Sequence, residues 1–168
     1  MIEWPDLREP LAGIRWAIVG GVATRAYMSE RMTQDLDVLV AAADAGEARR
    51  RLEEAGYDFA GPLSIPGIVL RSPAGIEVDL LFGESPWVDE ALAEPERDAA
   101  GYPVIGLPYL VLMKLEATRD QDWTDITRML GGAADEQLAR VRAVVERFAA
   151  ADVEDLETMI YLGRREQL

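Results

Sequence analysis

Asp35 and Asp37 lie two positions apart in segment 35–41, which alternates between polar and apolar residues and then becomes apolar. That pattern predicts a strand, in which both carboxylates project from the same face. Neighbouring carboxylates repel each other and resist burial, and a divalent cation such as Mg²⁺ relieves this repulsion. The alternative is a solvated strand edge with two acids, which is the more common meaning of this motif taken alone.

Two further features make the pattern more specific. Gly20 and Gly21 end the apolar run 14–19, which predicts a buried strand and a tight turn into a helix. Glycine lets a phosphate group approach the backbone, and the first helical amides point toward it. Asp79 shares a face with Glu77 on a later predicted strand. Each feature alone is explained by a turn or an amphipathic strand, but together they form a layout that can bind two metal ions and a triphosphate.

Lys114 is the only lysine among 17 basic residues. A compact ammonium can contact a phosphate where a planar guanidinium does not fit. The alternative is that its alkyl stem packs beside apolar neighbours while the charge reaches water. Asp122 and Asp125 follow at the start of another predicted helix, where capping explains Asp122 at least as well as catalysis does.

Composition excludes several kinds of chemistry. The chain of 168 residues contains no cysteine and no histidine, so disulfides, thiol catalysis and imidazole catalysis are absent. Its formal net charge of −14 disfavours binding to extended DNA or RNA, although a divalent cation would let it bind a phosphate. The first residues show no targeting pattern, and the longest apolar run, 104–113, is too short to cross a membrane. We therefore expect a cytoplasmic protein that does not associate with membranes.

The elements that must position these residues change in character at about residue 107. The pattern of residues 1–107 predicts a mixed αβ core. Its strands are expected at 14–19, 35–41, 68–71, 76–82 and 103–105, and its helices at 22–29, 45–55 and 86–92. The strand at 103–105 is expected at an edge of the sheet. Residues 108–168 predict a helical region packed on the core, whose helices span 107–119, 122–130, 135–149 and 152–165.

These motifs resemble those of the DNA polymerase β-like nucleotidyltransferase superfamily. The closest resemblance is to the AbiEii-type toxins of bacterial abortive-infection and toxin–antitoxin systems. The family's first motif, Gly-Gly or Gly-Ser and then Arg-x-Thr-x-Asp-φ-Asp with φ apolar, matches Gly20-Gly21 and residues 31–37. Its third acid matches Asp79, and its later helical motifs match residues 113–115 and 122–126. Many members have serine where this chain has Gly21, so the phosphate contact here would depend on backbone amides.

The resemblance implies an α/β (α+β) nucleotidyltransferase fold, a mixed β-sheet with flanking helices and a C-terminal helical bundle. It also implies transfer of a nucleoside monophosphate from an NTP to an acceptor hydroxyl, with release of pyrophosphate. Asp35 and Asp37 would bind two Mg²⁺ or Mn²⁺ ions together with the NTP, and Asp79 would complete the metal site and help to deprotonate the acceptor. The implied nucleotide-binding residues are Gly20, Gly21, Arg31, Thr33 and Lys114, of which Lys114 would also act in catalysis by neutralising charge on the triphosphate.

The acceptor and the biological role stay open. Toxin relatives modify tRNA ends, whereas antibiotic-modifying relatives act on small molecules, and the negative charge of this chain favours a small molecule or a protein. A different possibility is a catalytically silent module with this fold that binds a cognate partner protein in a toxin–antitoxin-like pair. Metal-dependent NTP binding would separate the enzyme from the silent module.

Overall fold

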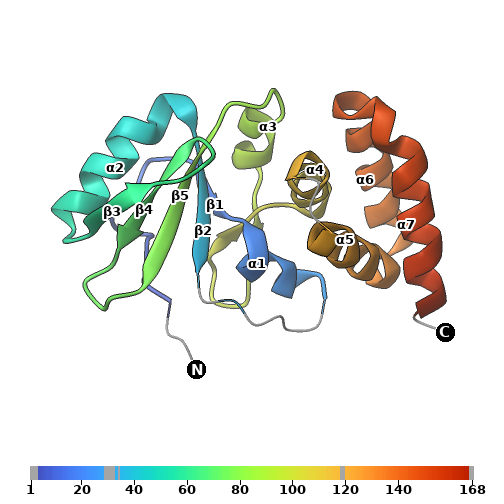
Figure 1. Ribbon diagram of the computed structural model, residues 1–168, viewed down its shortest axis with the longest axis horizontal. Coiled ribbons are helices and arrows are strands. Elements are labelled where there is room, and N and C mark those ends of the chain that lie inside the picture. The colour runs from blue at the N-terminus through green and yellow to red at the C-terminus, as the bar shows by residue number, and fades with distance from the viewer. Residues whose placement is uncertain (1–3, 29–32, 34, 118–119, 167–168) are drawn as a thin grey trace. The chain divides into compact units, whose positions relative to one another are not determined.

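The computed structural model describes residues 4–28, 33, 35–117 and 120–166, and these residues form two compact units (Figure 1). The first unit contains residues 4–23, 33 and 35–105, and the second contains residues 24–28, 106–117 and 120–166. The division after residue 105 lies two residues before the boundary expected from the sequence. The sequence also gives no sign that residues 24–28 belong with the C-terminal helices.

The first unit is built on a mixed sheet. Within the described residues it has seven strands in the order β3-β4-β5-β2-β1-β7-β6. Their bounds are β1 Trp16–Ile18, β2 Leu36–Ala41, β3 Asp58–Pro62, β4 Gly67–Arg71, β5 Glu77–Gly83, β6 Glu96–Arg97 and β7 Pro103–Val104. Strand β2 runs parallel to β5 and antiparallel to β1. The mixed sheet with helices confirms the predicted fold class.

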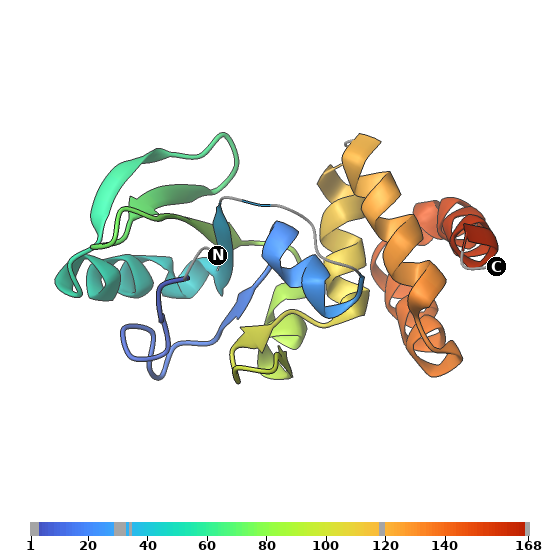
Figure 2. The same ribbon diagram turned by 90° about the horizontal axis from the view of Figure 1, so that it is seen from below.

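In the described part of this unit, the α-helices that accompany the sheet are α1 Gly20–Ala23, α2 Ala45–Glu54 and α3 Val88–Ala93. Helix α2 buries Ala48 and Leu52 and runs along one side of β3, β4 and β5 (Figure 2). The guanidinium of its Arg49 lies 4.7 Å from the centre of the Phe59 ring. Strand register places Phe59 on the same sheet face as Leu36, so α2 covers the face opposite to Asp37.

Several elements differ from the sequence-based expectation. The predicted edge strand at 103–105 is β7, which lies between β1 and β6. That prediction is wrong because the two-residue β6 is too short to show periodicity. Strand β3 was not predicted, since its exposed DFAGP sequence contains glycine and proline. The helix expected at 22–29 is instead the short α1 followed by the 3₁₀ helix Thr24–Ala26 (η1).

The second unit is helical. Its helices are α4 Leu107–Ala117, α5 Asp120–Gly132, α6 Asp135–Phe148 and α7 Val153–Glu166, and the 3₁₀ helix Ala150–Asp152 (η3) precedes α7. The prediction that Gly131 and Gly132 follow the end of a helix is wrong, because α5 includes both. A methyl group on Gly131 would lie 2.5 Å from the carbonyl oxygen of Gly163 in α7. Glycine is therefore required at this position by the close packing of two helices.

None of the helices in the described part of the chain is long and apolar enough to span a bilayer.

Candidate functional site

Two of the predicted acids meet in the sheet of the first unit. Asp37 on β2 and Asp79 on β5 are register partners on adjacent parallel strands. Register partners project from the same face of a sheet. The residues that precede them on the two strands, Leu36 and Val78, are fully buried on the opposite face, whereas both aspartates are only half-buried. The fold thus brings together two carboxylates that are far apart in the sequence.

Asp35 lies one residue before β2 and is exposed. Burial raises the pKa of Asp79 above its ordinary value, and the negative charges of Asp35 and Glu77 raise this pKa further. Arg71 pairs with Glu77 at 3.2 Å, but within the described residues Asp79 has no cationic partner. A cation placed beside Asp79 would therefore relieve an unfavourable electrostatic environment.

The predicted glycine turn lies directly beside the acid pair. Gly20 adopts a φ of 62°, in the left-handed region that favours glycine. A methyl group on Gly20 would overlap Oδ2 of Asp37, so the carboxylate fills the space that a side chain would need. The amide of Val19 donates a hydrogen bond of 2.9 Å to the carbonyl oxygen of Asp37. Position 20 thus requires glycine for two separate reasons, the backbone angle and the proximity of Asp37.

Thr33 lies against the second glycine of the turn. A methyl group on Gly21 would be 3.2 Å from both Cβ and Oγ1 of Thr33, so a side chain there would require Thr33 to shift by a few tenths of an ångström. The Thr33 hydroxyl donates a 3.3 Å hydrogen bond to the carbonyl oxygen of Asp35. Thr33 thus connects the glycine turn to the acidic strand. Arg31 lies outside the described residues.

Lys114 belongs to the second unit and is enclosed by two carboxylates. Its Nζ lies 2.9 Å from Oδ1 of Asp122 and 2.8 Å from Oδ2 of Asp125, and all three side chains are at most 7% exposed. Helix α5 begins at Asp120, so the interpretation of Asp122 as a helix cap is wrong and its carboxylate binds Lys114 instead. These contacts hold α4 against α5. The role of Lys114 in nucleotide binding stays a prediction.

The donor set of the first unit suits a hard cation bound jointly with a substrate. Within the described residues, no three acidic side chains are grouped so that they could hold a metal ion by themselves. Asp37 and Asp79 still offer adjacent carboxylates. Mg²⁺ is commonly bound by one or two carboxylates, with substrate phosphates and water as the remaining ligands. The residues therefore fit an ion that is shared with a nucleotide.

Pairing of β4 with β5 adds a neighbour that the sequence pattern does not indicate. Val69 is the register partner of Asp79 on β4 and is half-buried on the same face. It forms the sheet surface next to the acid pair. The only signal for this position is the register between strands, which a single sequence does not contain.

Comparisons with known proteins support the fold. No protein-family model matches the sequence, and no curated protein is significantly similar to it. A Thermotoga maritima protein assigned as a nucleotidyltransferase superposes with a TM-score of 0.52 at 18% identity, covering 76% of this chain and 91% of that one. The lincosamide antibiotic adenylyltransferase LnuA, with lincomycin bound, gives 0.50 at 15% identity, covering 81% and 92%. The predicted nucleotidyltransferase fold is confirmed.

Proposed function

We propose that the protein is a metal-dependent nucleotidyltransferase, which transfers a nucleoside monophosphate from an NTP to an acceptor hydroxyl and releases pyrophosphate. One observation carries the proposal. Asp37 and Asp79 are register partners on one sheet face, directly beside the left-handed Gly20, in a fold that nucleotidyltransferases share. The proposal includes the closer relationship to AbiEii-type enzymes, which rests on the sequence motifs.

Asp35, Asp37 and Asp79 would hold the metal, Mg²⁺ or Mn²⁺, as two ions with the NTP. Bound there, the metal neutralises phosphate charge and favours the ionised form of an acceptor hydroxyl. Asp79 would accept the proton of that hydroxyl, and its surroundings suit this task because they raise its pKa. Asp37, fixed against Gly20, would keep its carboxylate in one orientation.

The nucleotide would be bound from the glycine turn. Gly20 and Gly21 offer backbone amides, and the hydroxyl of Thr33 lies beside Gly21, where related enzymes have a serine hydroxyl. We infer that Thr33 supplies the hydroxyl contact that Gly21 lacks. Arg31 and Lys114 complete the proposed set. Lys114 has the weaker support, because its ammonium is already bound by two carboxylates.

Charge supports a small-molecule acceptor over tRNA. A chain of net charge −14 repels a polyanion, whereas a small neutral or cationic acceptor is not repelled. The name of LnuA describes an enzyme that acts on a lincosamide antibiotic, an acceptor of this kind. A tRNA end, a protein acceptor and a cognate toxin–antitoxin partner are the other outcomes that the assay distinguishes.

The test is an assay of label transfer. The purified chain would be incubated with each labelled NTP, Mg²⁺ or Mn²⁺, and tRNA, a cell protein extract or lincomycin and other hydroxyl-bearing antibiotics. Asp37→Asn and Asp79→Asn should each lower transfer by about 100-fold or more, as loss of a metal ligand does. Asp58→Asn is the matched control, since Asp58 is an exposed acid on β3.

Two results would contradict the proposal. One is transfer at the wild-type rate by both site variants. The other is NTP affinity, measured by calorimetry, that is the same with and without metal. If the wild-type chain neither binds an NTP nor labels any acceptor, the silent module that binds a partner protein is the better explanation.

A further inference from the structure

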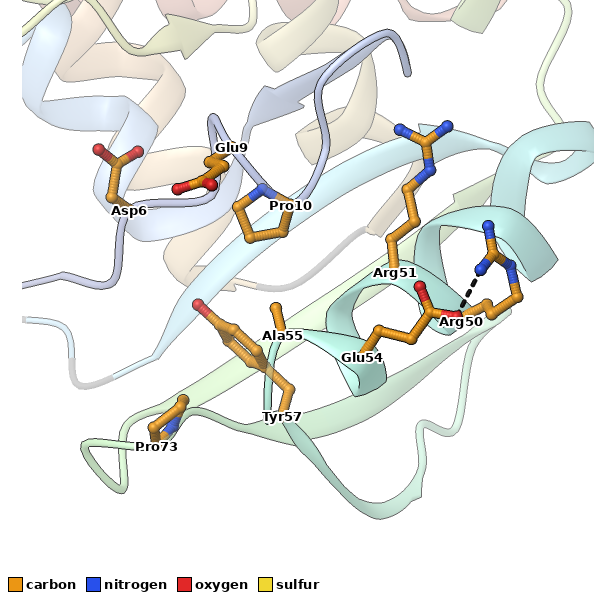
Figure 3. A pocket seen from close by; sticks show the side chains of 9 residues that line it. All are labelled: Asp6, Glu9, Pro10, Arg50, Arg51, Glu54, Ala55, Tyr57 and Pro73. Atoms are coloured by element: carbon orange, nitrogen blue, oxygen red, sulfur yellow. Dashed lines mark hydrogen bonds and ion pairs between the residues drawn. The ribbon is translucent and has the colours of Figure 1, made fainter.

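The first unit has a pocket beside α2, the helix that covers the sheet face opposite to Asp37 (Figure 3). Its volume is about 700 Å³, within the range of small-molecule sites. Its walls come from the segment before β1, the C-terminal half of α2, the residues after α2 and the β4–β5 turn. The pocket shares none of its lining residues with the acid pair.

Tyr57 supplies a polar group that no protein group satisfies. The side chain is 6% exposed, and its hydroxyl points into the pocket, toward the segment that carries Asp6 and Glu9 (Figure 3). Within the described residues, no group forms a hydrogen bond with this hydroxyl. Buried tyrosines normally bond their hydroxyl to a protein partner, whereas this hydroxyl opens into the pocket. Burial and the charge of Asp6 raise the pKa of Tyr57, so the hydroxyl keeps its proton. A ligand in the pocket would complete its hydrogen bonding.

The two arginines that line the pocket are already occupied. Arg50 binds Glu47 at 2.7 Å and Glu54 at 2.5 Å. Arg51 binds Glu47 at 2.7 Å and donates to the carbonyl oxygen of Ala12. Their positive charges are therefore balanced by carboxylates of the same helix, and an anion entering the pocket would have to displace them.

The remaining charge is negative. Asp6 is held by Arg8 at 2.6 Å, so this pair is also balanced. Glu9 is exposed at the pocket, and no described residue forms an ion pair with it. One carboxylate is thus left without a cation on the side toward which the Tyr57 hydroxyl points.

The other walls are apolar and include Pro10, Ala55 and Pro73. We propose that this pocket binds a small primary amine as its ammonium ion. The ammonium would donate hydrogen bonds to the Tyr57 hydroxyl and the Glu9 carboxylate, while an apolar body would lie against Pro10, Ala55 and Pro73. This site is separate from the proposed nucleotidyl transfer and does not depend on it.

The proposal can be tested by titrating the isotope-labelled full-length chain with cyclohexylammonium chloride near pH 7, observed by NMR. Cyclohexanol and cyclohexanecarboxylate are probes of the same shape without the positive charge. We expect saturable shifts of the Tyr57 ring signals at millimolar cyclohexylammonium. The two other probes should bind at least about tenfold more weakly, because charged hydrogen bonds are the stronger ones.

Tyr57→Phe removes only the hydroxyl, and Glu9→Gln removes only the charge. Each should weaken cyclohexylammonium binding by about tenfold, the loss expected for one hydrogen bond to a charged group. Glu136→Gln, at an exposed acid of α6, is the matched control and should leave binding unchanged. If Tyr57→Phe does not fold, Glu9→Gln decides, since Glu9 lies at the surface.

Three results would overturn the proposal: no saturable shift with cyclohexylammonium, equal or tighter binding of cyclohexanecarboxylate, or wild-type affinity in both variants. Both variants are expected to keep wild-type nucleotidyl transfer. Failure of one proposal therefore leaves the other unaffected.

Discussion

Asp37 and Asp79 in the first unit and Asp122 and Asp125 in the second are two pairs of neighbouring aspartates with different surroundings. The second pair encloses the ammonium of Lys114 and is almost completely buried. In the first unit, burial and nearby negative charges raise the pKa of Asp79, and no described cation offsets them. The buried pair Asp122 and Asp125 already binds a cation, Lys114, and this contact accounts for the pair by holding α4 against α5. An acid that lacks one is suited to a cation that arrives with a substrate.

The family resemblance predicts that the acid motif and Lys114 belong to one nucleotide site. The structure gives them different local chemistry, because Lys114 is already bound by two carboxylates and Asp79 has no described cationic partner.

The largest effect is expected for Lys114→Met. It leaves two buried carboxylates without their cation, which typically costs about 3–5 kcal/mol of unfolding free energy. Urea unfolding followed by circular dichroism measures this loss. The triple variant Lys114→Met/Asp122→Asn/Asp125→Asn should recover much of it. If Lys114→Met keeps wild-type stability but lowers kcat for nucleotidyl transfer, Lys114 acts on the nucleotide. The Asp122 and Asp125 pair would then not be purely structural.

Gly20→Ala should have the next largest effect. The substitution forces a side chain into the left-handed region and into the space of the Asp37 carboxylate, at a cost of about 2 kcal/mol or more. Gly46→Ala in α2 is the matched control, because a methyl group there meets nothing within 4 Å. That control should gain up to about 1 kcal/mol from helix propensity. Equal stability of the two variants would mean that Asp37 moves away readily and is not held by the turn.

Asp79→Asn should stabilise the protein near pH 7, by about 1 kcal/mol or less, because it removes a charge that burial and neighbouring acids disfavour. Asp125→Asn in the second unit should destabilise it, since it breaks an ion pair of 2.8 Å to Lys114. Thermal unfolding of both variants gives the comparison directly. A loss of stability in Asp79→Asn would indicate that Asp79 has a structural role like that of Asp125.

The sequence predicted the parts of the site that depend on local pattern. Alternation identified β2 and β5, and the paired glycines identified the turn at Gly20. The register that places Asp79 beside Asp37 depends on pairing between distant strands, so a single sequence could suggest it only through a family resemblance. For Asp122, the local sequence pattern is misleading. An aspartate near a helix start suggests a cap, but the partner is a lysine on the preceding helix, and the ion pair between them leaves no local signal.

A third set of acids gives the smallest expected effect and extends the comparison to the surface. Glu47 on α2 binds both Arg50 and Arg51, and their hydrogen bonds lower its pKa from 4.5 to about 2. A lowered carboxyl pKa stabilises the folded state above pH 4.5, and this contribution is lost as the pH falls from 4.5 toward 2. Glu47→Gln should therefore be slightly less stable than the wild type at neutral pH, with an effect at the low end of exposed ion pairs. The difference should shrink as the pH falls from 4.5 and be small near pH 2, where Glu47 is protonated in the unfolded chain and about half protonated in the folded chain. Thermal unfolding of both proteins between pH 2 and pH 7 measures it. A difference that persists unchanged at the lowest pH would show that Glu47 acts through packing rather than through its charge.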